Sequence, residues 1–211
     1  AIKPQGFAEL LPQIAQELKP HQVVISIAAG VTVGAISHLL ENESLPIVRA
    51  MPNMSAKVGH GATGLFANAY VSDDQKNIVA EVFEGCGIAT WVNDESLINA
   101  VIAVAGSSPA YFFLFAKLIG EVGAKMGLPA DVATKMAVET MLGSAQLAAE
   151  EGADLNDLIR SICSPKGTTE QAMISFENSD LLGVIEQAMQ AAVDRSEVLA
   201  LELDEKIRGA V

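Results

Sequence analysis

The segment 163–170, which reads Cys-Ser-Pro-Lys-Gly-Thr-Thr-Glu, has the residue types best suited to bind a small anion. Thr168 and Gln171 have the spacing of a capping box, which predicts that a helix begins near Thr169. The first turn of a helix offers unpaired N–H groups and a partial positive charge, and the dipole alone favours a carboxylate or phosphate by roughly 0.3–1 kcal/mol. Lys166 adds a positive charge. The same pattern also fits a well-capped helix start that binds nothing.

Metal and nucleophile chemistry find little support in the sequence. His21, His38 and His60 have no Cys or acidic partners at ligand spacing, so no metal site is expected. The serines occur in no nucleophile elbow, and no phosphate loop of the Gly-x-x-x-x-Gly-Lys-Ser/Thr type exists. Cys86 and Cys163 lie far apart, which predicts buried thiols in a protein of the reducing cytoplasm.

Composition limits the classes of partner. The formal net charge of −13 argues against nucleic acid and against an anionic membrane surface, because both need a basic protein surface. Half of the residues are hydrophobic and only 5% are aromatic, which favours helices and α/β layers. The apolar run 97–119 is interrupted by Asn99, Lys117 and the segment 106–109. We therefore expect a helix buried in protein there and no span of a membrane.

Residues 1–94 alternate between strand and helix patterns, which is typical of a mostly parallel sheet covered by helices. Short apolar runs predict strands at 23–27, 46–51, 61–67 and 88–92. Helical periodicity predicts helices at 7–19, 32–40 and 72–83. Ligands of such sheets bind at the C-terminal ends of strands, so we expect the loops 2–4, 28–30 and 51–53 to line a ligand site.

Residues 95–211 show helical patterns alone, which predicts an all-α domain after the α/β domain. The longest pattern, 95–126, should be distorted at Gly106-Ser107-Ser108-Pro109, because proline removes a backbone donor and clashes with the preceding turn. Further helices are expected at 130–151, 155–162, 169–177 and 181–208. Long helices of this kind commonly form an oligomerisation module.

Five short motifs follow one another along the chain, at 1–5 (Ala-Ile-Lys-Pro-Gln), 26–31 (Ser-Ile-Ala-Ala-Gly-Val), 49–53 (Arg-Ala-Met-Pro-Asn), 106–111 (Gly-Ser-Ser-Pro-Ala-Tyr) and 163–169. Together they resemble pyrroline-5-carboxylate reductase, the enzyme family that makes proline, over the whole chain. The resemblance implies a partial Rossmann-type dinucleotide-binding domain (1–94) and an all-helical dimerisation and substrate-binding domain (95–211). We expect the chain to lack the opening glycine-rich segment of the family. NADPH or NADH as cofactor, pyrroline-5-carboxylate as the small-molecule substrate, and a homodimer or larger homo-oligomer are also implied.

The resemblance assigns site residues by position. Those expected near the cofactor are Ile2, Lys3, Pro4, Ala28, Ala29, Gly30, Pro52, Asn53 and Pro109. Those expected to bind the substrate are Glu95, Ser164, Gly167, Thr168 and Thr169, and Thr169 is the catalytic residue that hydrogen-bonds the ring nitrogen. Glu95 fits equally well as an acid at an ordinary helix start. Lys166, where the family commonly has glycine, and Ser161, where some members have a larger polar residue, depart from the pattern.

Two other functions fit parts of the sequence. A hydroxyacid dehydrogenase of related two-domain architecture would use a lysine of the central helix as its acid, and Lys117 is the residue available. Alternatively, the chain is a non-catalytic module for oligomerisation and anion binding. Loss of turnover in Lys117→Ala but not in Thr169→Ala would favour the dehydrogenase. Failure to bind any nicotinamide nucleotide would favour the module.

Overall fold

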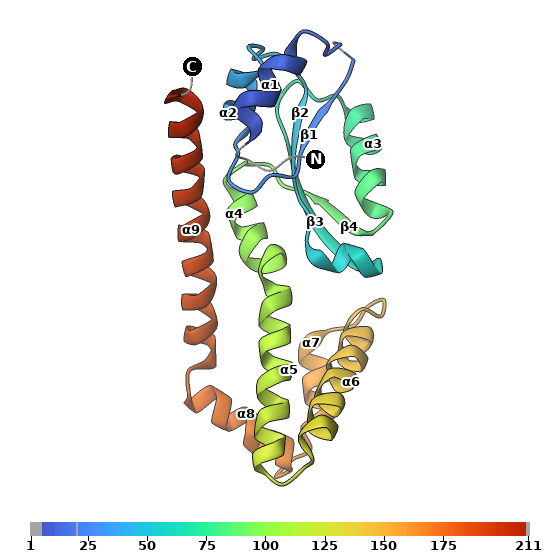
Figure 1. The fold of residues 1–211 in the computed structure, drawn as a ribbon. Helices are drawn as coiled ribbons and strands as arrows, with labels where there is room; N and C mark the ends of the chain where they lie inside the picture. Colours follow the sequence, from blue (N-terminus) through green and yellow to red (C-terminus); the bar gives the residue numbers. More distant parts are fainter. Residues whose placement is uncertain (1–5, 20, 210–211) are drawn as a thin grey trace. The chain divides into compact units, whose positions relative to one another are not determined.

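The computed structural model describes residues 6–19 and 21–209 (Figure 1). Their contacts form two compact units. We call the residues up to Pro109 together with those from Met189 onward the sheet unit, and Ala110–Ala188 the helical unit. The last strand ends at Trp91, but the helical turns that follow it keep their contacts with the sheet unit as far as Pro109. A domain boundary at residue 94 therefore stays a prediction.

The sheet unit contains a four-stranded sheet of order β1-β2-β3-β4. The strands are β1 (Val24–Ser26), β2 (Ile47–Met51), β3 (Gly61–Ala67) and β4 (Gly87–Trp91), which confirms the four predicted strands. β1 and β2 are parallel, as are β3 and β4, whereas β2 and β3 are antiparallel. The connection between β2 and β3 holds only the 3-10 helix η2 (Met54–Val58), and it is shorter than the dozen or so residues of a parallel crossover.

The stretch 59–64 reads Gly-His-Gly-Ala-Thr-Gly, which matches the glycine spacing of a dinucleotide-binding turn. In the structure this stretch leads from η2 into β3, whereas a phosphate-binding turn leads from a strand into a helix. A Cβ atom on Gly61 would lie 2.9 Å from the Cys86 carbonyl oxygen, and one on Gly64 would lie 2.6 Å from Val101. These glycines therefore serve the close packing of β3.

Helices cover both faces of the sheet (Figure 1). α1 (Phe7–Ala15) and α2 (Val33–Leu39) lie on one face, and α3 (Asp73–Glu84) lies on the other. β2 is buried on both faces: Ile47 belongs to the core cluster with α1, α2 and Ile207 of α9, and Val48 clusters with Val79 of α3. This double burial explains why β2 is a nearly continuous apolar run.

The helix that follows the sheet is widened in the middle. α4 (Leu97–Val101) and α5 (Ser108–Lys125) are joined by the π-helical turn η3 (Ile102–Gly106), in which the Ser107 N–H donates to the Ile102 carbonyl oxygen at 2.7 Å. The predicted distortion is confirmed. By length and composition alone Leu97–Lys125 is apolar enough to cross a membrane, with a mean hydropathy of 1.6, and little of it is buried. The expectation of a buried helix is therefore wrong for the chain by itself.

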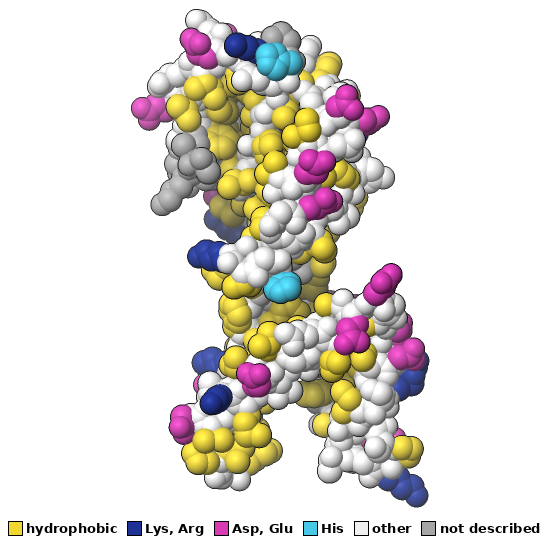
Figure 2. Space-filling model, turned by 90° about the vertical axis from the view of Figure 1, so that its right-hand side faces the viewer, with side chains coloured by type: hydrophobic (Ala, Val, Ile, Leu, Met, Phe, Trp, Pro, Cys, Tyr) yellow, Lys and Arg dark blue, Asp and Glu magenta, His cyan; other side chains and the backbone are white. Residues whose placement is uncertain are grey.

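The helical unit contains most of α5, then α6 (Ala130–Ala148), α7 (Leu155–Ile162), α8 (Thr168–Asn178) and the first turns of α9 (Leu181–Gly209). α5 and α6 approach closely, because a Cβ atom on Gly120 would lie 3.1 Å from the Thr134 Cα atom. An apolar groove of about 380 Å³ runs between α5 and α6. Figure 2 shows apolar side chains on one face of the molecule. The large apolar side chains that are exposed on α5 are Phe112, Phe113, Leu114, Phe115, Leu118, Ile119 and Val122.

Candidate cofactor and substrate sites

Two of the three predicted ligand loops lie at one edge of the sheet. β1 and β2 are parallel neighbours with Ser26 opposite Arg49, so their C-terminal ends lead into the loops 28–30 and 52–53 side by side. Ala28 is buried and Ala29 is exposed, which leaves small side chains at this edge. Ile2, Lys3 and Pro4, which form the third predicted loop, lie outside the described residues.

The backbone conformation explains why position 30 is a glycine. Its φ of 78° lies in the left-handed region that favours glycine. A Cβ atom there would lie 3.1 Å from the Leu203 side chain and 3.5 Å from the Ala200 backbone nitrogen, both on α9. The left-handed backbone, together with the close packing of α9, therefore accounts for this glycine without a ligand, and its contact with a cofactor stays a prediction.

Asn53 joins three segments at the same edge. Its Nδ2 atom donates to the Ala105 carbonyl oxygen in η3 at 3.0 Å, and its Oδ1 atom accepts from the Ala62 N–H in β3 at 3.2 Å. Ala105 precedes the buried Pro109 by one helical turn. The structure therefore brings the η3 turn, and Pro109 with it, to the loop that contains Pro52 and Asn53.

Glu95 takes part in a partly buried ion pair that the sequence did not reveal. Its Oε1 atom accepts from the Val33 N–H at the start of α2 at 2.8 Å, and from Arg49 Nη1 at 3.1 Å. Arg49 is only 4% exposed, and its Nη2 atom has no partner among the described residues. A charged residue inside an otherwise apolar strand was the available signal. Glu95 thus caps the start of α2, and not the start of the helix that follows it in the chain. Its contact with a substrate stays a prediction.

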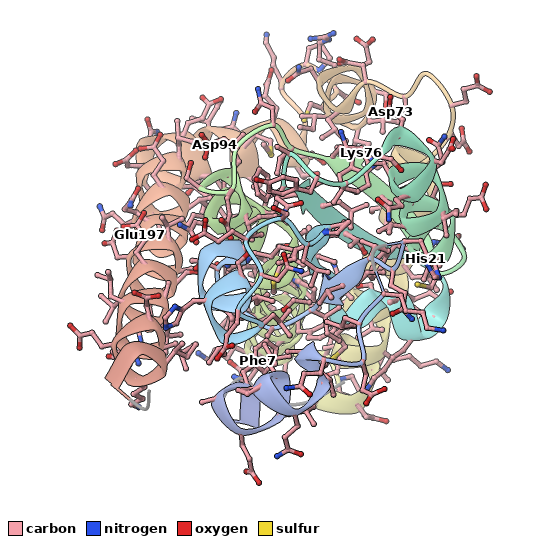
Figure 3. All side chains as sticks on the ribbon, turned by 90° about the horizontal axis from the view of Figure 1, so that it is seen from above. Phe7, His21, Asp73, Lys76, Asp94 and Glu197 are labelled. Atoms are coloured by element: carbon pink, nitrogen blue, oxygen red, sulfur yellow. The ribbon has the colours of Figure 1, made fainter. Side chains whose placement is uncertain are left out.

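The neighbouring Asp94 organises the loop before α4 (Figure 3). Its Oδ1 atom accepts from the Ser96 hydroxyl at 2.6 Å and from the Ser96 N–H at 2.8 Å. These two hydrogen bonds, the one from the hydroxyl first, lower the pKa of Asp94 below its ordinary value. The Asp94 carboxylate therefore ties the two residues on either side of Glu95 together.

The predicted anion-binding turn is a tight β-turn followed by α8. The Gly167 N–H donates to the Ser164 carbonyl oxygen at 2.8 Å. Pro165 at the second position and Lys166 at the third, with a φ of 60°, are typical of a type II turn. The third position of that turn favours glycine, so Lys166 occupies a backbone conformation that is unusual for its residue type.

The predicted capping box is wrong. α8 begins at Thr168, one residue earlier than expected, and its N-cap is Gly167, which provides no side-chain cap. A Cβ atom on Gly167 would lie 2.8 Å from the Ser164 carbonyl oxygen, so the turn itself excludes a side chain there. Glu170 bonds back to the Lys166 N–H at 2.7 Å. The acid one turn into α8 therefore stabilises the turn in place of the threonine.

Three of the five residues expected to bind the substrate keep free polar groups among the described residues. Within the described part of the chain, the N–H groups of Thr168 and Thr169 have no hydrogen-bond partner. The hydroxyls of Ser164, Thr168 and Thr169 have none there either. The Gly167 N–H is used within the turn, so the contribution of Gly167 is to shape the backbone. The turn thus offers a cluster of free donors at the start of a helix, which suits a carboxylate.

Ser161 and Lys117, the other two polar residues of interest in the helical unit, are occupied. The Ser161 hydroxyl donates to the Leu158 carbonyl oxygen of its own helix at 2.7 Å. Lys117 pairs with Glu121 at 2.7 Å on an exposed face of α5, and this pairing lowers the pKa of Glu121. Neither residue takes part in the turn at 164–169.

A sheet with helices on both faces, followed by a run of helices, defines a protein with a partial Rossmann-type domain and an all-helical domain. Comparisons with known proteins then give the family. The family described as pyrroline-5-carboxylate reductase dimerisation matches residues 95–199. The chain is 40% identical over 203 residues to the pyrroline-5-carboxylate reductase of Pseudomonas aeruginosa. The alignment covers 96% of this chain and 74% of that protein. The chain belongs to the pyrroline-5-carboxylate reductase family.

Other relatives and solved structures agree. Pyrroline-5-carboxylate reductase 1 of Bacillus subtilis is 32% identical over 97% of this chain and 68% of its own length. The structure of the Coxiella burnetii reductase matches with a TM-score of 0.90 and 37% identity, over 95% of this chain and 74% of that one. The structure of the Plasmodium falciparum reductase, solved with NADP bound, matches with a TM-score of 0.82 and 27% identity. The match covers 95% of this chain and 79% of that chain. The predicted family and fold class are confirmed.

Proposed function

We propose that this chain reduces 1-pyrroline-5-carboxylate to L-proline, the last step of proline biosynthesis, with NADPH or NADH as the hydride donor. The observation that supports it best is a set of donors that have no partner among the described residues, in a chain of this family: the hydroxyls of Ser164, Thr168 and Thr169 and the N–H groups of Thr168 and Thr169. The substrate is a small ring with one carboxylate and one imine nitrogen, and these are the groups such donors can hold.

The turn at 164–169 would fix the substrate by its carboxylate. The Ser164 and Thr168 hydroxyls and the N–H groups at the start of α8 donate to the carboxylate oxygens, and the helix dipole favours the negative charge. Gly167 and Lys166 hold the turn in shape. The carboxylate acts as a handle, which leaves the imine end of the ring to Thr169.

Thr169 would hydrogen-bond the ring nitrogen and so align the imine carbon. The nicotinamide, when bound, supplies the hydride that this carbon accepts. The step needs orientation and a hydrogen-bonded or protonated nitrogen more than it needs a nucleophile or a metal. Ser164, Thr168 and Thr169, which carry hydroxyl groups, meet this requirement because they can hydrogen-bond and orient the substrate.

The cofactor would lie along the edge formed by the ends of β1 and β2. Ala28 and Ala29 present small side chains there, and Asn53 holds the η3 turn with Pro109 to the same edge. These residues fit a flat ring lying against backbone. Ile2, Lys3, Pro4, Gly30 and Pro52 complete the set proposed for the cofactor.

The chain would work as a homodimer or larger homo-oligomer in the cytoplasm, without nucleic acid or membrane as partner. Adjacent residues of α5 such as Phe112, Phe113, Leu114 and Phe115 are all exposed, and because they follow one another they point to different sides of the helix. A second copy that wraps this helix would cover them. The net charge of −13 opposes binding to nucleic acid and to anionic lipid.

The test is the rate of NADPH and NADH oxidation with pyrroline-5-carboxylate, measured for this chain and for the chain preceded by the opening segment of the Pseudomonas aeruginosa relative. We expect Thr169→Ala to lower kcat/KM by roughly 100-fold, because an aligned donor is lost, and Thr169→Ser to retain most of the activity. No turnover in either protein would contradict the proposal and favour the non-catalytic module. Loss of activity in Lys117→Ala with full activity in Thr169→Ala would favour the hydroxyacid dehydrogenase.

A further inference from the structure

The Ala105 carbonyl oxygen lacks its usual helical hydrogen-bond donor because residue 109 is a proline. In an α-helix this oxygen would accept from the N–H of residue 109, but Pro109 has no N–H. Asn53 Nδ2 donates to the oxygen instead, at 3.0 Å. A side-chain amide from the loop after β2 thus takes the place of a backbone group within the helix.

The same contact draws η3 towards the end of β2. Asn53 Oδ1 accepts from the Ala62 N–H of β3, so the Asn53 side chain is held at both ends. Close by, a Cβ atom on Gly106 would lie 3.2 Å from the Met51 Cε atom, so η3 packs closely against the end of β2. The loop after β2, the start of β3 and the η3 turn are therefore locked together within the sheet unit.

We propose that Asn53 is a positioning residue of the reductase, which holds the η3 turn and Pro109 at the edge of the sheet where the nicotinamide binds. The family resemblance places Asn53 near the cofactor, and the geometry gives it a different task. Its Oδ1 and Nδ2 atoms are both engaged with backbone groups of the protein. The predicted effect of Asn53 on turnover rests on the proposed function. Its predicted effect on the position of η3 rests on the hydrogen-bond geometry alone.

The kinetic test compares Asn53→Ala with a matched control, Asn68→Ala. Asn68 also bridges backbone groups with both ends of its side chain, since Oδ1 accepts from the Ile47 N–H at 3.1 Å and Nδ2 donates to the Leu45 carbonyl oxygen at 2.8 Å. It does so beside Ile47, the first residue of β2, away from the strand end that carries the ligand loops. A variant that merely weakens the sheet unit should thus behave like Asn68→Ala.

We expect Asn53→Ala to lower kcat by about 10- to 100-fold, because a small misplacement of reacting groups has effects of that size. The Kd for NADPH should change by less than about threefold, and Asn68→Ala should leave kcat within about threefold. A Kd raised tenfold with kcat unchanged would overturn the inference, because it would show a direct contact with the cofactor. Equal losses of kcat in the two variants would overturn it as well.

The pH dependence of Asn53→Asp gives a second readout. The carboxylate keeps the acceptor for Ala62 but faces the Ala105 oxygen without a hydrogen, and protonation restores the donor. The ratio of variant to unaltered kcat should therefore rise as pH falls, whereas the ratio for Asn53→Ala stays flat. A flat ratio for Asn53→Asp as well would contradict a role for the donated hydrogen bond.

A double-mutant cycle with Pro109→Ala needs no turnover. An N–H at position 109 can satisfy the Ala105 oxygen, so the loss of the Asn53 amide should matter less. Unfolding in urea is followed by the fluorescence of Trp91, the only tryptophan in the sequence, which lies in β4 of the sheet unit. The midpoint shift caused by Asn53→Ala should be at least halved in the Pro109→Ala background, and an unchanged shift would overturn the inference. If the unaltered protein proved inactive, the proposed function would fail, but this cycle would still test the hydrogen bond between Asn53 and Ala105.

Discussion

Removal of the Glu95 carboxylate tests the buried ion pair between β2, α2 and the loop before α4. In Glu95→Ala, Arg49 keeps its positive charge at 4% exposure, neither of its terminal nitrogens has a partner among the described residues, and the Val33 N–H loses its acceptor. Breaking a buried pair on one side typically costs about 3–5 kcal/mol, and losing a helix cap costs about 1 kcal/mol. The Glu95 side chain is itself 26% exposed, so water can reach the gap and reduce the cost.

We therefore expect Glu95→Ala to lower the free energy of unfolding of the sheet unit by about 3 kcal/mol, which corresponds to a drop in Tm of roughly 6–12 °C. Glu95→Gln keeps an acceptor for the Val33 N–H and for Arg49, and should cost only about 1–2 kcal/mol. The double variant Arg49→Met/Glu95→Ala removes both charges and should lie closer to the unaltered protein than Glu95→Ala does.

The assay is urea unfolding followed by Trp91 fluorescence at fixed protein concentration, because an oligomer's stability depends on concentration. A cost below about 0.5 kcal/mol for Glu95→Ala would show that this ion pair does not stabilise the sheet unit, since Arg49 would then be satisfied by some other group. A rise in the KM for pyrroline-5-carboxylate in Glu95→Gln, with stability unchanged, would show that Glu95 binds the substrate.

Three further predictions concern the turn and the loop before α4. Lys166→Gly should raise the stability of the helical unit by about 0.5–1 kcal/mol in thermal unfolding followed by circular dichroism, because φ 60° is strained for lysine. Gly167→Ala should raise the KM for pyrroline-5-carboxylate more than tenfold, since its Cβ atom would lie 2.8 Å from the Ser164 oxygen; an unchanged KM would show that the turn adapts. Ser96→Ala should return the lowered pKa of Asp94 towards 3.8 in a carboxyl NMR titration, and an unmoved pKa would rule out the hydroxyl as its cause. Because the folded-state pKa is depressed, these bonds stabilise the loop above pH 3.8, and their contribution is lost as pH falls through the lowered pKa.

The secondary structure could be predicted because its signals are local. The apolar block at β2 and the proline after η3 each act within a few residues, and the strands and the distorted helix follow from them. The direction of β3 relative to β2 depends instead on the length of one connection, which a strand pattern does not contain. The start of α8 was misplaced because Gly167 and Glu170 stabilise it through a turn whose geometry needs Lys166 in the left-handed region.

The contacts that hold the site were beyond the sequence for a different reason. Arg49 and Glu95 are 46 residues apart, and Asn53 and Ala105 are 52 residues apart. Chain spacing says nothing about such pairs until the sheet places them. The buried arginine and the proline one turn after Ala105 marked groups that needed partners, but they did not say which residues would supply them.

The site residues predicted from the family resemblance are of two kinds, and the structure separates them by the state of their polar atoms. Ser164, Thr168 and Thr169 keep donors that have no partner among the described residues, so these donors can bind a ligand. Asn53 and Glu95 have theirs bonded to backbone groups of other elements. Variants of the first kind should change binding and turnover while the fold keeps its stability. Variants of the second kind should change stability first, and turnover only through the segments they hold in place.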